Sequence, residues 1–96
     1  MSCYFLAQIK IRDKKLYQKY LEGFDAVFAR YDGKVIAVDD RVKILEGAWH
    51  YTRMVIIRFS DRSEAERWYF SDAYQQLRLF RTQASDADII LVEGRD

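Results

Sequence analysis

The residue type most often used in catalysis, histidine, occurs once in this 96-residue chain. His50 follows Trp49 in a segment that we expect to be a loop. An imidazole in this position can act as a general base or a haem ligand, or it can be an ordinary solvated side chain. A metal site needs several converging His, Cys or carboxylate ligands. We therefore expect neither a metal site nor a bound cofactor.

Arg81 is the arginine best placed for binding, because it lies seven residues after Tyr74 beside the inward face of the last predicted helix. Its planar guanidinium suits a carboxylate. That carboxylate can belong to a ligand, or to a structural acid of the chain such as Glu46 or Asp88. The sequence leaves both interpretations open.

Aromatic and acidic side chains complete the candidate site. Tyr69 and Tyr74 can place phenol groups between helices and sheet, or they can belong to the core, as aromatic residues at helical spacing usually do. Glu46 and Trp49 can line the mouth of a pocket or pack at an edge. The predicted ligand-binding residues are thus Arg81, Tyr74, Tyr69, Trp49, His50 and Glu46.

The first elements expected to position these residues are a strand and a helix. Cys3–Ile11 has an apolar residue at every second position on one face, which is typical of a strand. Lys14–Tyr31 has apolar residues at steps of three and four, with Asp13 as its N-cap. Gly33 is expected to adopt the left-handed conformation after the helix.

The second half of the chain predicts further strands and two helices. Ser71 is the expected cap of the last helix, whose Ala73, Leu77, Phe80 and Ala84 share one side. Asp61 with Glu64 resembles a capping box before the other helix. The predicted elements are two pieces of an extended arm (Lys34–Val38 and Val42–Glu46), a strand (Arg53–Phe59), helices (Arg62–Phe70 and Asp72–Ala84) and a final strand (Asp88–Glu93).

This order predicts one α+β domain over residues 1–96, with the ferredoxin-like βαββαβ fold, an antiparallel sheet and helices on one face. A solvated sheet face is normally polar. Here the strands carry apolar residues on both faces of the sheet. Phe5 and Leu6, for example, point to opposite faces, and so do Ile56 and Ile57. We therefore predict a homodimer that buries sheet against sheet, the alternative being an unevenly patterned small core.

Composition narrows the classes of partner. Sixteen basic and fifteen acidic residues are interleaved, so no basic stripe for a nucleic acid is visible. No apolar segment approaches the roughly 20 residues of a membrane span, and no signal peptide is apparent. The single cysteine, Cys3, cannot form an internal disulfide, which fits a reducing compartment. We expect a cytoplasmic protein that binds neither nucleic acid nor membrane.

Several segments together resemble the domain of unknown function 1330 family, over nearly the whole chain. They are Ile44 to Trp49, Arg53, Val55 to Phe59, Trp68-Tyr69, Ser71, Tyr74, Arg81, and Ala87-Asp88 to Gly94. The resemblance implies a dimeric α/β barrel, a superfamily that includes cofactor-free monooxygenases, isomerases and haem-handling proteins. The chain has Ser71-Asp72-Ala73-Tyr74 where the family often has Ser-Pro-Glu-Tyr, and it lacks the common proline near Trp49.

Two functions of different classes follow. The first is a homodimeric module that binds a small apolar or aromatic ligand, with a carboxylate as a candidate polar group. The second is a cofactor-independent monooxygenase or isomerase that uses tyrosine, arginine and His50. A structural protein without a ligand is a third. Convergence of His50, Tyr74 and Arg81 on one cavity would favour catalysis.

The sequence contains no glycine-rich phosphate loop and supports no Ser-His-Asp arrangement.

Overall fold

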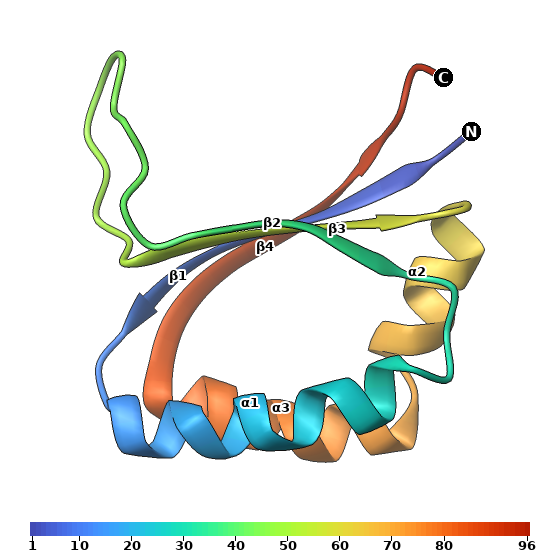
Figure 1. The fold of residues 1–96 in the computed structure, drawn as a ribbon, viewed down its shortest axis with the longest axis horizontal. Coiled ribbons are helices and arrows are strands. Elements are labelled where there is room, and N and C mark those ends of the chain that lie inside the picture. The colour runs from blue at the N-terminus through green and yellow to red at the C-terminus, as the bar shows by residue number, and fades with distance from the viewer.

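The computed structural model describes all 96 residues as a four-stranded sheet with three helices on one face. Figure 1 shows the sheet above α1 and α3, with α2 rising between the two layers at one end. The elements are β1 (Cys3–Ile11), α1 (Lys14–Phe28), β2 (Lys34–Asp39), β3 (Arg53–Phe59), α2 (Arg62–Tyr69), α3 (Asp72–Ala84) and β4 (Ser85–Glu93). The predicted α+β ferredoxin-like fold is confirmed. The two consecutive helices α2 and α3 stand where the βαββαβ pattern has its second helix.

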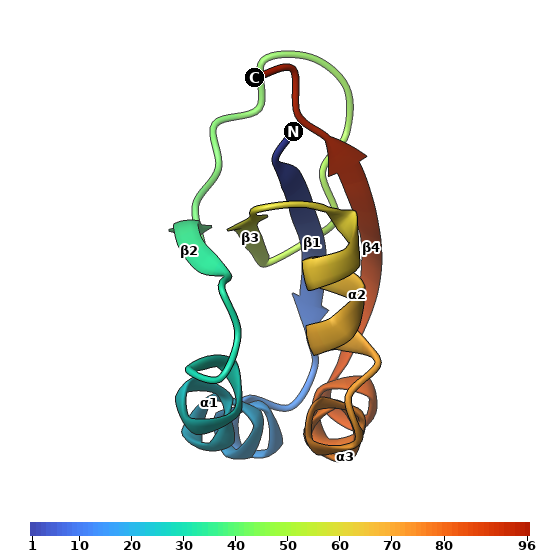
Figure 2. The same cartoon turned by 90° about the vertical axis from the view of Figure 1, so that its right-hand side faces the viewer.

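The sheet has the strand order β2-β3-β1-β4 with every pair antiparallel. β1 is central, and its inward residues Phe5, Ala7 and Ile9 are buried. Figure 2 shows α1 and α3 next to each other below the strands, with α2 in front of them. On the opposite face Leu6 pairs with Ile56 and with Ile90. The outer face is therefore apolar at its centre, as the strand pattern predicted.

All three helices begin at the predicted side-chain caps. Asp13 Oδ1 accepts a hydrogen bond from the Leu16 N–H at 3.0 Å, which satisfies one of the free donors of the first turn of α1. Asp61 and Ser71 cap α2 and α3 in the same way. These caps fix where each helix starts, and hence which side chains of each helix face the sheet.

The core between the layers is aromatic and is centred on Trp68, which is fully buried. The rings around it are arranged mostly edge to face, which is a favourable arrangement for aromatic pairs. They belong to Phe5, Phe24, Phe28, Phe59, Tyr69 and Tyr74, with centroids 4.3–6.2 Å from that of Trp68. This cluster fills the α2 end of the molecule.

Several predicted boundaries are wrong. α1 ends at Phe28 instead of Tyr31, β4 starts at Ser85 instead of Asp88, and residues 42–46 form no strand. Gly33 is not left-handed, since Gly47 is the only residue with positive φ (83°). Gly33 is needed for space instead: a Cβ there would lie 2.5 Å from a Phe59 ring atom.

The predicted inward side of α3 also needs a correction. Phe80 is 38% exposed, whereas Tyr74, Leu77, Arg81 and Ala84 are buried. These four positions follow steps of three, four and three, so they share one helical face. The face turned to the sheet thus carries Arg81 itself, because the apolar stripe is rotated relative to the one expected.

Residues 40–52 connect β2 to β3 as a long arm that projects away from the helices in Figure 1. Leu45 near its tip is 83% exposed. Asp40 and Arg53 form an ion pair of 2.8 Å at its base, which ties the two ends of the arm together. None of the helices is long and apolar enough to span a membrane.

Candidate functional site

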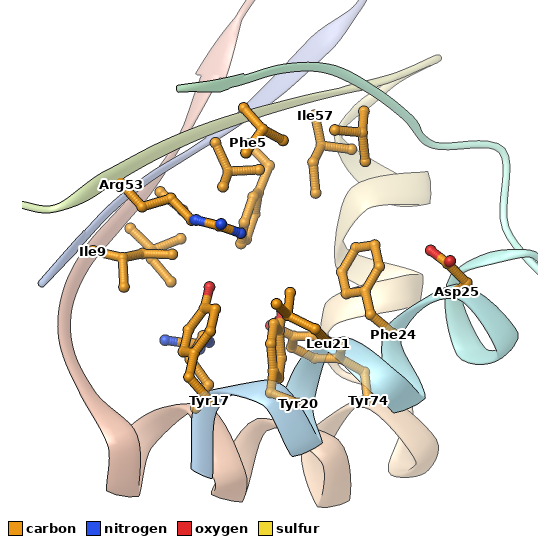
Figure 3. Close-up of a pocket in the computed structure, with 16 residues that line it drawn as sticks. Phe5, Ile9, Tyr17, Tyr20, Leu21, Phe24, Asp25, Arg53, Ile57 and Tyr74 are labelled. Atoms are coloured by element: carbon orange, nitrogen blue, oxygen red, sulfur yellow. The ribbon is translucent and has the colours of Figure 1, made fainter. Parts of the chain in front are cut away.

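A cavity of about 290 Å³ lies between the sheet and the helices. Figure 3 shows Phe5, Ile9, Arg53 and Ile57 pointing into it from the sheet, toward Tyr17, Tyr20, Leu21, Phe24 and Tyr74 on the helices. Of its 16 lining residues 13 are hydrophobic, and the charged ones are Asp25, Arg53 and Arg81. An apolar cavity with a few converging polar groups is the usual form of a small-molecule site.

The small side chain of Ala7 explains why the layers leave this space. Ala7 stands between Phe5 and Ile9 on the inner face of the central strand, and it is 2% exposed. Its partners across the sheet, Val55 and Ile89, also line the cavity and are only partly buried. The sheet is therefore hollowed at its centre, whereas large rings fill the α2 end.

Arg81 reaches the cavity from α3 and is only 4% exposed. It forms no ion pair, and its Nε atom is buried without a hydrogen-bond partner. Burial acts to lower the pKa of Arg81, but the phenol oxygens of Tyr74 and Tyr20 outweigh it, and the pKa is raised. The guanidinium is therefore charged at neutral pH.

Neither acid considered as a structural partner of Arg81 takes that role. Asp88 accepts a hydrogen bond from the Tyr51 hydroxyl, and Glu46 is exposed in the arm. The groups that stabilise the cation are the phenol oxygens of Tyr74 and Tyr20 and the ring of Tyr20, whose centroid lies 5.9 Å from Arg81 Cζ. The structural-pair interpretation of Arg81 has no carboxylate to support it.

Arg53 is a second arginine at the cavity, and it was not among the predicted ligand-binding residues. Its Nε and Nη2 bind the two carboxylate oxygens of Asp40 at 2.8 and 3.1 Å. Its Cζ lies 5.7 Å from the centroid of the Tyr17 ring. Because Arg53 shares its parity with the inward residues Val55 and Ile57, the strand period could have placed it on the cavity face.

The tyrosines of the cavity are hydrogen-bond donors. The hydroxyls of Tyr20 and Tyr74 lie 2.9 Å apart. Burial, together with Tyr74, raises the pKa of Tyr20 well above its usual value. Burial also raises the pKa of Tyr17, although Arg53 and Arg81 oppose the shift. Both phenols are thus protonated at neutral pH, and neither is a base there. Tyr17 and Tyr20 belong to the apolar face of α1, and nothing in the sequence distinguishes them from core residues.

The predicted site residues divide into two groups. Tyr74 and Arg81 line the same cavity. Tyr69 contacts Tyr74, with ring centroids 5.4 Å apart, but it lines neighbouring surface grooves instead.

The other three predicted residues lie in the arm, outside the cavity. Trp49 packs edge to face on Tyr51 at 4.9 Å, while Glu46 and His50 are exposed. His50 does not converge with Tyr74 and Arg81 within one chain. No group of three or more His, Cys, Asp or Glu side chains is placed to hold a metal ion.

Together the fold and the cavity define a ferredoxin-like α+β protein with an apolar pocket between its layers. The chain belongs to the family described as a domain of unknown function (DUF1330), whose model matches residues 2–95. A comparison with curated proteins found no match.

Solved structures share the fold at low sequence identity. A protein of unknown function from Rhodopseudomonas palustris is 18% identical with a TM-score of 0.81, covering 99% of this chain and 83% of that one. SnoaB, a cofactor-independent oxygenase from Streptomyces nogalater, is 12% identical with a TM-score of 0.71, covering 99% and 94%. A dimeric ferredoxin-like protein of unknown function from Jannaschia sp. CCS1 is 8% identical with a TM-score of 0.71, covering 98% and 100%.

Proposed function

We propose that this protein is a homodimeric binding module that holds a small apolar or aromatic molecule between its helices and its sheet. The observation that carries the proposal is the cavity of about 290 Å³, with its apolar lining and its few converging polar groups. The aromatic rings of Tyr17, Tyr20 and Phe24 offer flat surfaces to a ring-containing ligand.

The dimer is supported by the outer face of the sheet. Leu6, Ile56 and Ile90 lie side by side there, and Ile90 is 58% exposed. Apolar patches of this kind usually mark association surfaces. The similar structure from Jannaschia sp. CCS1 is described as dimeric, which agrees with this use of the face.

A cofactor-independent enzyme is less well supported by the geometry, despite the likeness to SnoaB. His50, the side chain best suited to proton transfer, lies outside the cavity. The phenols of Tyr17 and Tyr20 have raised pKa values, so they do not act as bases near neutral pH. The cavity offers apolar contacts and hydrogen-bond donors to a ligand, and a binding module needs no more than these.

The test uses a neutral two-ring probe, 2-naphthalenemethanol, in calorimetric titrations. Ala7→Leu fills the hollow at the centre of the sheet, and we expect it to weaken binding by about one to two powers of ten, because overpacking typically costs about 1–3 kcal/mol. Ala26→Leu makes the same change on the exposed side of α1 and is the matched control. Tight, Ala7-dependent binding supports the proposal. Absence of binding to the wild type, or equal binding to both variants, contradicts it.

A further inference from the structure

We propose that the cavity selects a monoanion, namely an aromatic or apolar carboxylate whose charged group pairs with Arg81. This inference rests on the proposed binding function and specifies the chemical class of the ligand. It is drawn from the balance of charges around the cavity, from the free hydrogen-bond donors beside Arg81, and from the size of the space.

The charges that line the cavity leave one cation without a partner. Arg53 is neutralised by the two-bond contact with Asp40. Asp25 is exposed, and in Figure 3 Phe24 lies between Asp25 and Tyr17. Arg81 is buried, forms no ion pair and has an unpartnered Nε. A buried charge is costly unless it is paired, so a site of this kind is completed by an anion from outside the chain.

Hydrogen-bond donors beside Arg81 suit the same anion. The hydroxyls of Tyr20 and Tyr74 share one hydrogen bond of 2.9 Å, in which one donates and the other accepts. The accepting hydroxyl keeps its own proton, which is free to be donated to a ligand. A carboxylate oxygen can therefore accept from this phenol while Arg81 binds the group through its planar fork. A dianion such as a phosphate would need a second free cation, and Arg53 is already paired.

The volume limits the body of the ligand. A cavity of about 150 Å³ accommodates benzene, and the space here is about 290 Å³. The ratio is close to two, which corresponds to a two-ring body. The apolar and aromatic lining fits such a body, so the occupant expected is a two-ring monocarboxylate.

The experiment compares 2-naphthoate with its neutral analogue 2-naphthamide by calorimetry at pH 7.5. Loss of a charge-assisted hydrogen bond corresponds to about one to two powers of ten in affinity. We therefore expect the wild type to prefer the carboxylate by about 10- to 100-fold. Arg81→Met should remove this preference by weakening naphthoate binding while leaving naphthamide binding nearly unchanged. Arg81→Lys keeps the charge without the fork and should retain part of the preference.

The matched control is Arg78→Met, which removes the same charge about one turn earlier on α3. Arg78 binds Gln75 and does not line the cavity, so the preference should persist in this variant. Equal wild-type affinities for naphthoate and naphthamide would overturn the monoanion inference and leave the binding function standing. Failure of both probes to bind would overturn both proposals. A preference for naphthoate that survives Arg81→Met would overturn the role of Arg81. If that variant does not fold, the ratio of naphthoate to naphthamide affinity in the wild type and in Arg81→Lys decides.

Discussion

Replacing Arg81 with methionine should leave the stability of the ligand-free protein nearly unchanged, whereas the same change at a buried arginine that forms an ion pair is strongly destabilising. Arg81 is 4% exposed, has an unpartnered Nε and contacts no carboxylate. Methionine fills most of the space of the arginine stem while removing the buried charge. The change therefore tests directly whether the chain itself supplies a partner for this cation.

The magnitude follows from two opposing contributions. Removing a buried donor that lacks a partner recovers about 1–3 kcal/mol. Losing the interactions of Arg81 with the Tyr20 ring, whose centroid lies 5.9 Å away, and with the phenol oxygens of Tyr74 and Tyr20 costs a similar amount, because these groups keep the pKa of Arg81 raised despite its burial. The net change expected is within about 1 kcal/mol of zero, which for a domain of this size keeps Tm within roughly 4–8 °C of the wild-type value.

Calorimetric melting of wild type and variant at equal protein concentration measures the difference. Both proteins should first be unfolded in denaturant and refolded, because a retained ligand would stabilise the wild type selectively. Arg78→Met is the control and should change the free energy of unfolding by less than about 0.5 kcal/mol. A loss of about 3–5 kcal/mol in Arg81→Met would refute the reasoning, since that is the cost of breaking a buried ion pair from one side.

Three further predictions concern assembly, pH and metal. By light scattering, wild-type protein should have twice the chain mass of 11.5 kDa, and Leu6→Glu should give monomers or insoluble protein. A wild-type monomer at micromolar concentration would contradict the sheet-to-sheet dimer. Folding raises the pKa of the Tyr20 phenol. The contribution of the protonated phenol to the unfolding free energy is therefore fully present below about pH 10, the pKa of an unfolded tyrosine, and is lost as the pH rises from there through the pKa of the folded state. Tyr20→Phe should flatten the decline of unfolding free energy above that pH, and an unchanged slope would argue against the buried phenol. A strong chelator should leave Tm unchanged, and a fall that zinc reverses would reveal a metal site shared between subunits.

Much of the fold could be predicted because its signals are local. The alternation of Cys3–Ile11 and the caps Asp13, Asp61 and Ser71 each depend on a few neighbouring residues, and the structure confirms all of them. The role of Gly33 could not be predicted in this way. Gly33 is required by the rings of Phe28 and Phe59, and Phe59 lies 26 residues further along the chain.

The cavity was only partly accessible from the sequence for the same reason. Arg81 and Tyr74 fall on one helical face, so helical spacing could bring them together. The hollow itself depends on the small Ala7 facing larger residues from other elements, and the pairing of Arg53 with Asp40 depends on the path of residues 40–52. Neither is visible without the tertiary arrangement. His50 shows the converse, since a chemically suitable residue type carried no information about where the arm would place it.

The measurement that most directly tests the central claim is a crystal structure of the protein grown with 2-naphthoate. We expect electron density for the two rings between α1 and the sheet, against Tyr20 and Phe24, with the carboxylate within hydrogen-bond distance of Arg81. Naphthoate bound only at the protein surface would contradict the proposed binding site. So would an Arg81 paired with a carboxylate of the protein in a cavity closed by its own side chains.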